Sequence, residues 1–304
     1  MRKYINKINI FFLILTSVAF GMVYRPLRDL LGFTDHGEYY SHIILIPLVS
    51  AYFLYLKRKE LILNPRYSPS SGILLIAVGI ALYLYGTTLQ INLNLDPHSS
   101  LIVLSALVFW MGGFILFFGT RAVRIAMFPI LFLAFMIPVP NILMEKIISV
   151  LLIGSTEVTY ILFGLTGIPV SREGFVFQLP GISIEIAKQC SGIRSSLALL
   201  ITGVLAAHFF LKSKWKKAFF IFSILPIAVL KNGIRIVTLS ALAIYVDEKF
   251  ITQSFLHKSG GFVFFLPALG ILGLILWGLR RTEVEDRGTR ETKEGGHGDT
   301  EARR

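Results

Sequence analysis

Long apolar runs separated by short polar connections fill most of the chain. Runs close to membrane-spanning length occur near residues 8–24, 42–56, 72–91, 99–118, 122–137, 193–211, 217–246 and 260–279. A hydrocarbon core of about 30 Å needs about 20 apolar helical residues, so the two shortest runs require flanking residues or local thinning. The pattern predicts an all-α polytopic membrane protein with about eight transmembrane helices.

Three stretches depart from this pattern. Residues 141–165 are apolar but carry three charges, which favours a helix lying in the outer interface over a ninth span. Residues 167–188 alternate apolar and polar positions around glycines, which predicts a small extracytoplasmic hairpin before the cysteine helix. The run 217–246 is too long for one untilted span and contains Pro226, so we expect one bent helix or two half-helices.

Composition agrees with a membrane protein. The chain of 304 residues is 54% hydrophobic and 16% charged, with a mean hydropathy of +0.70. We therefore predict one integral membrane domain over residues 1–281. The remaining residues, 282–304, are rich in charge and glycine and are predicted to form a disordered cytoplasmic tail.

The basic charge is distributed as in a membrane protein rather than as in a nucleic-acid-binding protein. A formal net charge of +12 is compatible with nucleic acid, but lysines and arginines gather at alternate helix connections, as the positive-inside rule requires. These clusters place both termini in the cytoplasm and predict no nucleic-acid partner. Ser17 and Ala19 leave open whether the first span is a cleaved signal peptide.

Cys190 is the only cysteine, which excludes an internal disulfide or a multi-thiolate metal site. Lys188 and Arg194 flank it, and the helix predicted over 197–211 would carry it in its first turn. Cations and a helix N-terminus both favour the reactive thiolate. A small buried hydrophobic residue is the alternative interpretation.

Arg235 lies inside an apolar run, three residues after Asn232 and therefore on the same helical face. An arginine at the centre of a membrane helix costs about 2.5–3.5 kcal/mol on insertion scales. A structural ion pair would compensate that cost. We favour the alternative, in which Arg235 is a partner for a thiolate or a developing oxyanion.

Two of the six histidines are candidates for the site. His257 falls in the last outer loop, on the same predicted face as Cys190 and Arg235, where it could act as an acid and base. His42 begins the second apolar run and suits either a site or an interfacial belt. No cluster has metal-ligand spacing, so we predict no metal and no organic cofactor.

These residues carry a resemblance to the exosortase/archaeosortase family of membrane transpeptidases. Residues 190–195 (CSGIRS) are similar to the cysteine motif of that family, and residues 232–236 (NGIRI) to its arginine motif. His257, ahead of a Gly-Gly-Phe sequence, resembles the third position in the bacterial branch. The segment 39–47 around His42 resembles an early family segment, although Ile43 replaces its usual glycine.

The resemblance implies a function at the bacterial cytoplasmic (inner) membrane, with the active site facing the extracytoplasmic side. Its clients would be exported proteins with a C-terminal sorting signal, PEP-CTERM-like: a short motif, a hydrophobic helix within the lipid bilayer, and a basic end. The cleaved product would pass to an acceptor related to cell-surface or extracellular polysaccharide. The residues do not identify that acceptor further.

The resemblance also implies residue roles. Cys190 would attack the peptide carbonyl and form a thioester, His257 would protonate the leaving amine, and Arg235 would stabilise negative charge. Asn232 would orient Arg235 by hydrogen bonding, and Arg194 would position the thiol or pair with Glu185. Ser191 and Gly192 belong to the cysteine motif as supporting residues.

Two rival functions remain open from the sequence. A membrane S-acyltransferase would use the same thiol to move a lipid. A non-catalytic transporter or assembly factor would use Arg235 as a binding charge. Replacing Cys190 with serine separates the classes, because a transporter should tolerate the change and a thiol enzyme should not.

Overall fold

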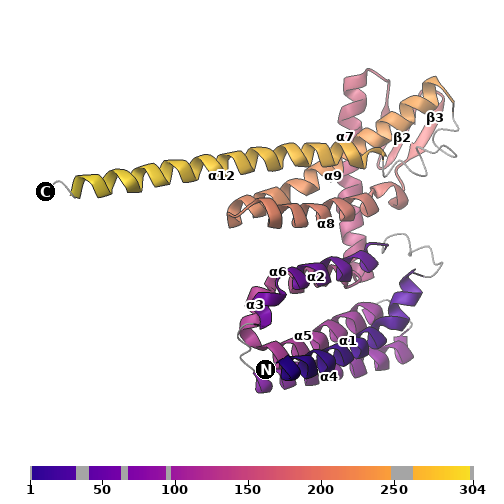
Figure 1. The fold of residues 1–304 in the computed structure, drawn as a ribbon. Coiled ribbons are helices and arrows are strands. Elements are labelled where there is room, and N and C mark those ends of the chain that lie inside the picture. The colour runs from indigo at the N-terminus through magenta and orange to yellow at the C-terminus, as the bar shows by residue number, and fades with distance from the viewer. Residues whose placement is uncertain (1, 32–40, 63–67, 94–96, 248–262, 302–304) are drawn as a thin grey trace. The chain divides into compact units, whose positions relative to one another are not determined.

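The computed structural model describes residues 2–31, 41–62, 68–93, 97–247 and 263–301 (Figure 1). The chain divides into two units, Met1–Met144 and Glu145–Arg304. Within the described residues, seven helices are long and apolar enough to cross a membrane: Ile10–Arg28, Pro69–Thr88, His98–Ile125, Asn141–Thr166, Ile193–Phe210, Lys214–Tyr245 and Phe265–Val284. The predicted class, an all-α polytopic membrane protein, is confirmed.

The first unit is built entirely from helices among its described residues. In chain order these are α1 (Arg2–Leu31), η2 (Ser41–Ile44), α2 (Leu45–Leu56), α3 (Arg58–Ile62), α4 (Pro69–Leu93), α5 (Pro97–Ile125), α6 (Met127–Phe132) and η3 (Leu133–Met136). Helices α4 and α5 pack as a close antiparallel pair. A Cβ at Gly72 would lie 2.8 Å from the Leu116 backbone, and one at Gly79 would lie 2.7 Å from Phe109 N, so glycine permits this approach.

The spans differ from the prediction in two places. The apolar helices His42–Leu56 and Met127–Met136 are shorter than the seven candidate spans. By contrast, α7 (Asn141–Thr166) is long and apolar enough to cross, so the expectation of an interfacial helix over 141–165 is not supported. Helix α5 runs across the boundary predicted between the runs 99–118 and 122–137, with a non-helical conformation at Gly119.

The second unit combines helices with a small sheet. After α7 come β1 (Ser171–Glu173), β2 (Val176–Leu179), β3 (Ile182–Glu185), η4 (Lys188–Ser191), α8 (Ile193–Phe210), α9 (Lys214–Tyr245) and α12 (Phe265–Glu301). The strands are antiparallel in the order β1-β2-β3. The predicted hairpin is therefore present with a third strand. Its turns contain Gly174 and Gly181, both at positive φ.

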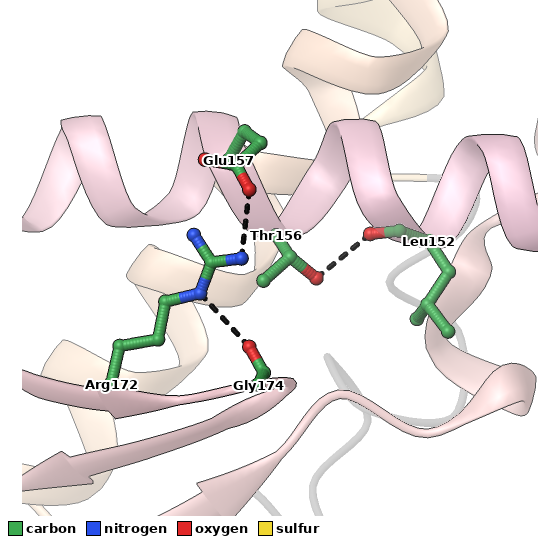
Figure 2. Close-up of polar contacts among 5 residues, drawn as sticks. All are labelled: Leu152, Thr156, Glu157, Arg172 and Gly174. Atoms are coloured by element: carbon green, nitrogen blue, oxygen red, sulfur yellow. Dashed lines mark hydrogen bonds and ion pairs between the residues drawn. The ribbon is translucent and has the colours of Figure 1, made fainter.

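Arg172 connects the sheet to α7 (Figure 2). Its Nη2 donates to Glu157 Oε1 at 2.7 Å, and its Nε donates to the Gly174 carbonyl at 2.9 Å. The hydrogen bond that the Arg172 guanidinium donates to Glu157 raises the pKa of Arg172. The pair compensates one of the charges in α7 that had argued against a span, and it fixes the β1–β2 turn beside that helix.

Helices α8, α9 and α12 pack together around a core that includes Leu199, Phe220, Ile224 and Leu272 (Figure 1). Helix α9 is continuous for 32 residues through Pro226, so the two-half-helix alternative is not observed. Glu283 of α12 accepts hydrogen bonds from the backbone N–H groups just before α9, which satisfies donors at that helix end.

Helix α12 continues from the last candidate span to Glu301, and the disordered cytoplasmic tail over residues 282–304 stays a prediction. The segment from 282 to 301 contains no proline, the residue that most strongly stops a helix. Its charge and glycine content are the basis of that prediction, because the segment offers little apolar surface to bury. A helix that projects from an apolar span needs no such burial to begin, since the span already provides its first turns.

Candidate functional site

Cys190 lies in η4, the short 3-10 helix that follows the sheet. Helix α8 begins only at Ile193, so the thiol precedes that helix instead of lying in its first turn. The Cys190 N–H donates to the Ala187 carbonyl at 2.8 Å, which closes the 3-10 turn. The side chain is half-buried and packs against an apolar cluster that includes Phe177 and Val237.

Gly192 joins η4 to α8 and adopts a left-handed conformation, with φ 72° and ψ 18°. A Cβ at this position would lie 2.8 Å from Asn232 Oδ1. Both the conformation and the space therefore require glycine. The structure thus explains the glycine of the Cys-Ser-Gly motif: only glycine fits the left-handed turn from η4 into α8 beside Asn232.

Asn232 holds the cysteine turn from α9. Its Nδ2 donates to the Cys190 carbonyl at 2.8 Å and to Ser155 Oγ of α7 at 3.0 Å, and the residue is 1% exposed. From the sequence we expected a hydrogen bond between Asn232 and Arg235. The side-chain amide instead binds the cysteine turn, because it faces η4 and α7 across the helix interface.

Lys231, one residue earlier in α9, is a functional candidate that the sequence analysis did not single out. It is 5% exposed, and its Nζ donates to Ser195 Oγ in the first turn of α8. Ser195 Oγ in turn donates to the Gly192 carbonyl at 3.0 Å. A lysine inside an apolar run, four residues before Arg235, was the available signal.

Arg235 completes the group on α9. It is four residues after Lys231, on the same helical face, and it is half-buried. The Cys190 side chain interacts electrostatically with its guanidinium, and so does the Lys231 ammonium. The structure thus brings the thiol, Asn232 and Arg235 together, as the sequence predicted. It adds a second cation to them.

Helix α7 packs against α9 next to Asn232 and supports this arrangement. A Cβ at Gly233 would lie 2.7 Å from Val158 Cγ1, so α9 approaches α7 closely next to Asn232. Ser155 and Thr159, one turn apart in α7, are both fully buried there. Ser155 accepts the Asn232 hydrogen bond, and Glu157 between them holds the sheet through Arg172. One turn of α7 therefore anchors both the sheet and the cysteine turn.

The remaining predicted site residues have different placements. Ser191 is fully buried, and its Oγ has no hydrogen-bond partner among the described residues. Arg194 is exposed at the start of α8.

His42 lies half-buried in η2 of the first unit, so its role stays a prediction. His257 lies outside the described residues. Within them, no group of His, Cys, Asp or Glu side chains could hold a metal ion.

A comparison with protein-family models identifies the family of the chain. The family model for the transmembrane exosortase (Exosortase_EpsH) matches residues 34–274, which is most of the chain. The chain belongs to the transmembrane exosortase family. Neither a curated protein nor a solved structure matches it. The family region includes His42, the cysteine turn, Arg235 and His257, and it ends inside α12.

Proposed function

We propose that this exosortase is a cysteine-dependent peptidase and transpeptidase of the cytoplasmic membrane. It would cleave C-terminal sorting signals of exported proteins on the extracytoplasmic side and transfer the product to an acceptor. The electrostatic interaction between Cys190 and Arg235, beside the hydrogen bond from Asn232 of the same helix to the Cys190 carbonyl, carries the proposal. A guanidinium beside a thiol in a half-buried site favours the thiolate, the form that attacks a carbonyl.

The proposed reaction assigns one task to each residue. The Cys190 sulfur attacks the carbonyl carbon of the scissile peptide, and the oxygen gains negative charge that Arg235 stabilises. The C–N bond then breaks, the leaving amine takes a proton from His257, and a thioester remains on Cys190. An acceptor nucleophile attacks that thioester and displaces the thiolate.

Other features support a precisely held nucleophile. Asn232 binds the Cys190 carbonyl, Gly192 fixes the turn, and the buried Ser191 hydroxyl has no partner among the described residues. A buried hydroxyl without a partner carries a desolvation cost. A substrate or water that fills the site would relieve that cost, which suits a supporting role for Ser191.

The test is client processing in cells. Cys190→Ala and Cys190→Ser should both leave an exported client with a C-terminal sorting signal at full length and anchored by its uncleaved helix. Serine should not substitute, because a hydroxyl is far less acidic than a thiol. The measurement is client size by immunoblot, together with mass spectrometry of Cys190 in the wild-type chain for a client adduct.

A matched control is Ser183→Ala on the exposed face of β3, close in sequence to the cysteine but outside its contacts. It should process the client normally. Full processing by Cys190→Ala, in a strain without a second enzyme of this family, would contradict the proposal. A fatty acyl adduct on Cys190 in place of a peptide adduct would favour the S-acyltransferase.

A further inference from the structure

Lys231 is a buried cation that the proposed reaction does not use. It lies in the middle of α9, is 5% exposed, and interacts electrostatically with Arg235 one turn away. Two like charges so close, in a segment of membrane-spanning character, repel each other and lose hydration. A neutral residue at position 231 would avoid this repulsion and loss of hydration. We therefore expect the Lys231 ammonium to make an interaction that offsets the cost.

The contacts of Lys231 lead to the cysteine turn. Its Nζ donates to Ser195 Oγ, and Ser195 Oγ donates to the Gly192 carbonyl at 3.0 Å. This chain of hydrogen bonds runs in one direction, from the ammonium through the hydroxyl to the backbone. A charged donor polarises the hydroxyl and strengthens the bond that the hydroxyl makes.

Lys231 and Asn232 act on opposite ends of one turn. Asn232 binds the carbonyl of Cys190, and Lys231 reaches the carbonyl of Gly192 through Ser195. Two neighbouring residues of α9 therefore restrain the segment 190–192 at both ends. Arg235 projects from the same helix, so this restraint fixes the thiol relative to its cation.

We propose that Lys231 is a positioning residue, which acts through Ser195 to hold the Cys190 turn beside Arg235. The inference rests on the proposed function only in that Cys190 is taken as the nucleophile. Lys231 does not touch the reacting atoms in this proposal. Loss of the Lys231–Ser195 bond lets the turn move away from Arg235, and the thiolate then loses the cation that favours it.

The thiol itself supplies the readout, because Cys190 is the only cysteine in the chain. The full chain in lipid nanodiscs is treated with iodoacetamide, and the rate of alkylation is followed by intact mass. Lys231→Met and Ser195→Ala should each slow alkylation about three- to tenfold. Lys214→Met, at the exposed start of the same helix, is the matched control and should react as the wild type does.

Two further variants separate positioning from packing. Methionine nearly matches the volume of lysine, so a purely packing role predicts that Lys231→Met is tolerated better than Lys231→Arg. Our proposal predicts the reverse, because arginine keeps a charged donor for Ser195. The double variant Lys231→Met/Ser195→Ala should be no slower than the slower single variant, since both changes break one chain of hydrogen bonds.

If Lys231→Met does not fold, the alkylation rates of Ser195→Ala and Lys231→Arg still test the inference. Wild-type alkylation by Ser195→Ala, or rates that multiply in the double variant, would overturn the inference. The alkylation assay needs no client. A failure of the transpeptidase proposal would appear as a Cys190 variant that still processes its client, and that result is separate from the coupling measured here.

Discussion

The two arginines near the thiol differ in surroundings, and their replacements should differ accordingly. Arg235 is half-buried and interacts with Cys190, whereas Arg194 is exposed at the start of α8. Arg235→Lys should lower client processing about 10²–10³-fold, the typical loss for one oxyanion donor. A lysine at this position offers a point charge in place of a planar fork.

Arg194→Lys is the matched comparison, because it makes the same chemical change at an exposed position. It should keep most of the wild-type rate, measured as the initial rate at which full-length client disappears. Equal and mild losses from both variants would argue against Arg235 as the partner of the oxyanion.

At the residue scale, the sequence singled out the thiol, Asn232 and Arg235 as candidates, because each is chemically conspicuous in an apolar chain. It assigned Asn232 to the wrong partner. Spacing places residues on a helical face, but it does not show which neighbouring element that face meets. Lys231 was missed for a related reason: the role proposed for it depends on Ser195, 36 positions away in sequence, and only packing brings the two residues together.

At the element scale, the reversal from η4 into α8 should be the least tolerant turn of the second unit. Gly192 and Gly174 both have positive φ, where an L-residue costs about 1–2 kcal/mol. At Gly174 a Cβ meets nothing within 4 Å, but at Gly192 it would meet Asn232 Oδ1. Gly192→Ala should therefore lower the melting temperature in detergent more than Gly174→Ala does.

Gly174→Ala isolates the backbone strain, because the same change is made in open space. It should retain client processing, while Gly192→Ala should abolish it by displacing Asn232 from the Cys190 carbonyl. Similar melting temperatures and normal processing by both variants would show that the turn adapts to a side chain.

Element boundaries were less predictable than element types. The hairpin of β2 and β3 was predicted from alternation, and the structure adds β1, whose Ser-Arg-Glu sequence has no apolar residue and therefore gave no such signal. The charges in 141–165 suggested an interface, yet Glu157 is paired with Arg172, a residue that follows the helix. Charge in an apolar run is a weak guide when its partner comes from another element.

At the scale of the whole molecule, the apolar runs predicted about eight spans, while seven helices among the described residues are long and apolar enough to cross. The side of the membrane predicted for Cys190 does not depend on the total number of spans. Helix α8 runs from Ile193 to Phe210 and is one candidate crossing, and it is followed directly by a connection rich in lysine. Cys190 precedes one end of this helix and the lysines follow the other.

Reporter fusions test this local argument directly. The Lys212, Lys214, Lys216 and Lys217 cluster predicts that the α8–α9 connection is cytoplasmic, and one crossing by α8 then places Cys190 on the extracytoplasmic side. A fusion at Lys214 should therefore report the cytoplasm, and one at Ser254, in the predicted outer loop of His257, should report the exterior. Replacing the four lysines with glutamine in the Lys214 fusion should weaken its cytoplasmic signal, because the charge bias sets the orientation. Cytoplasmic signal at Ser254 would place His257 away from an extracytoplasmic thiol and remove it from the proposed reaction.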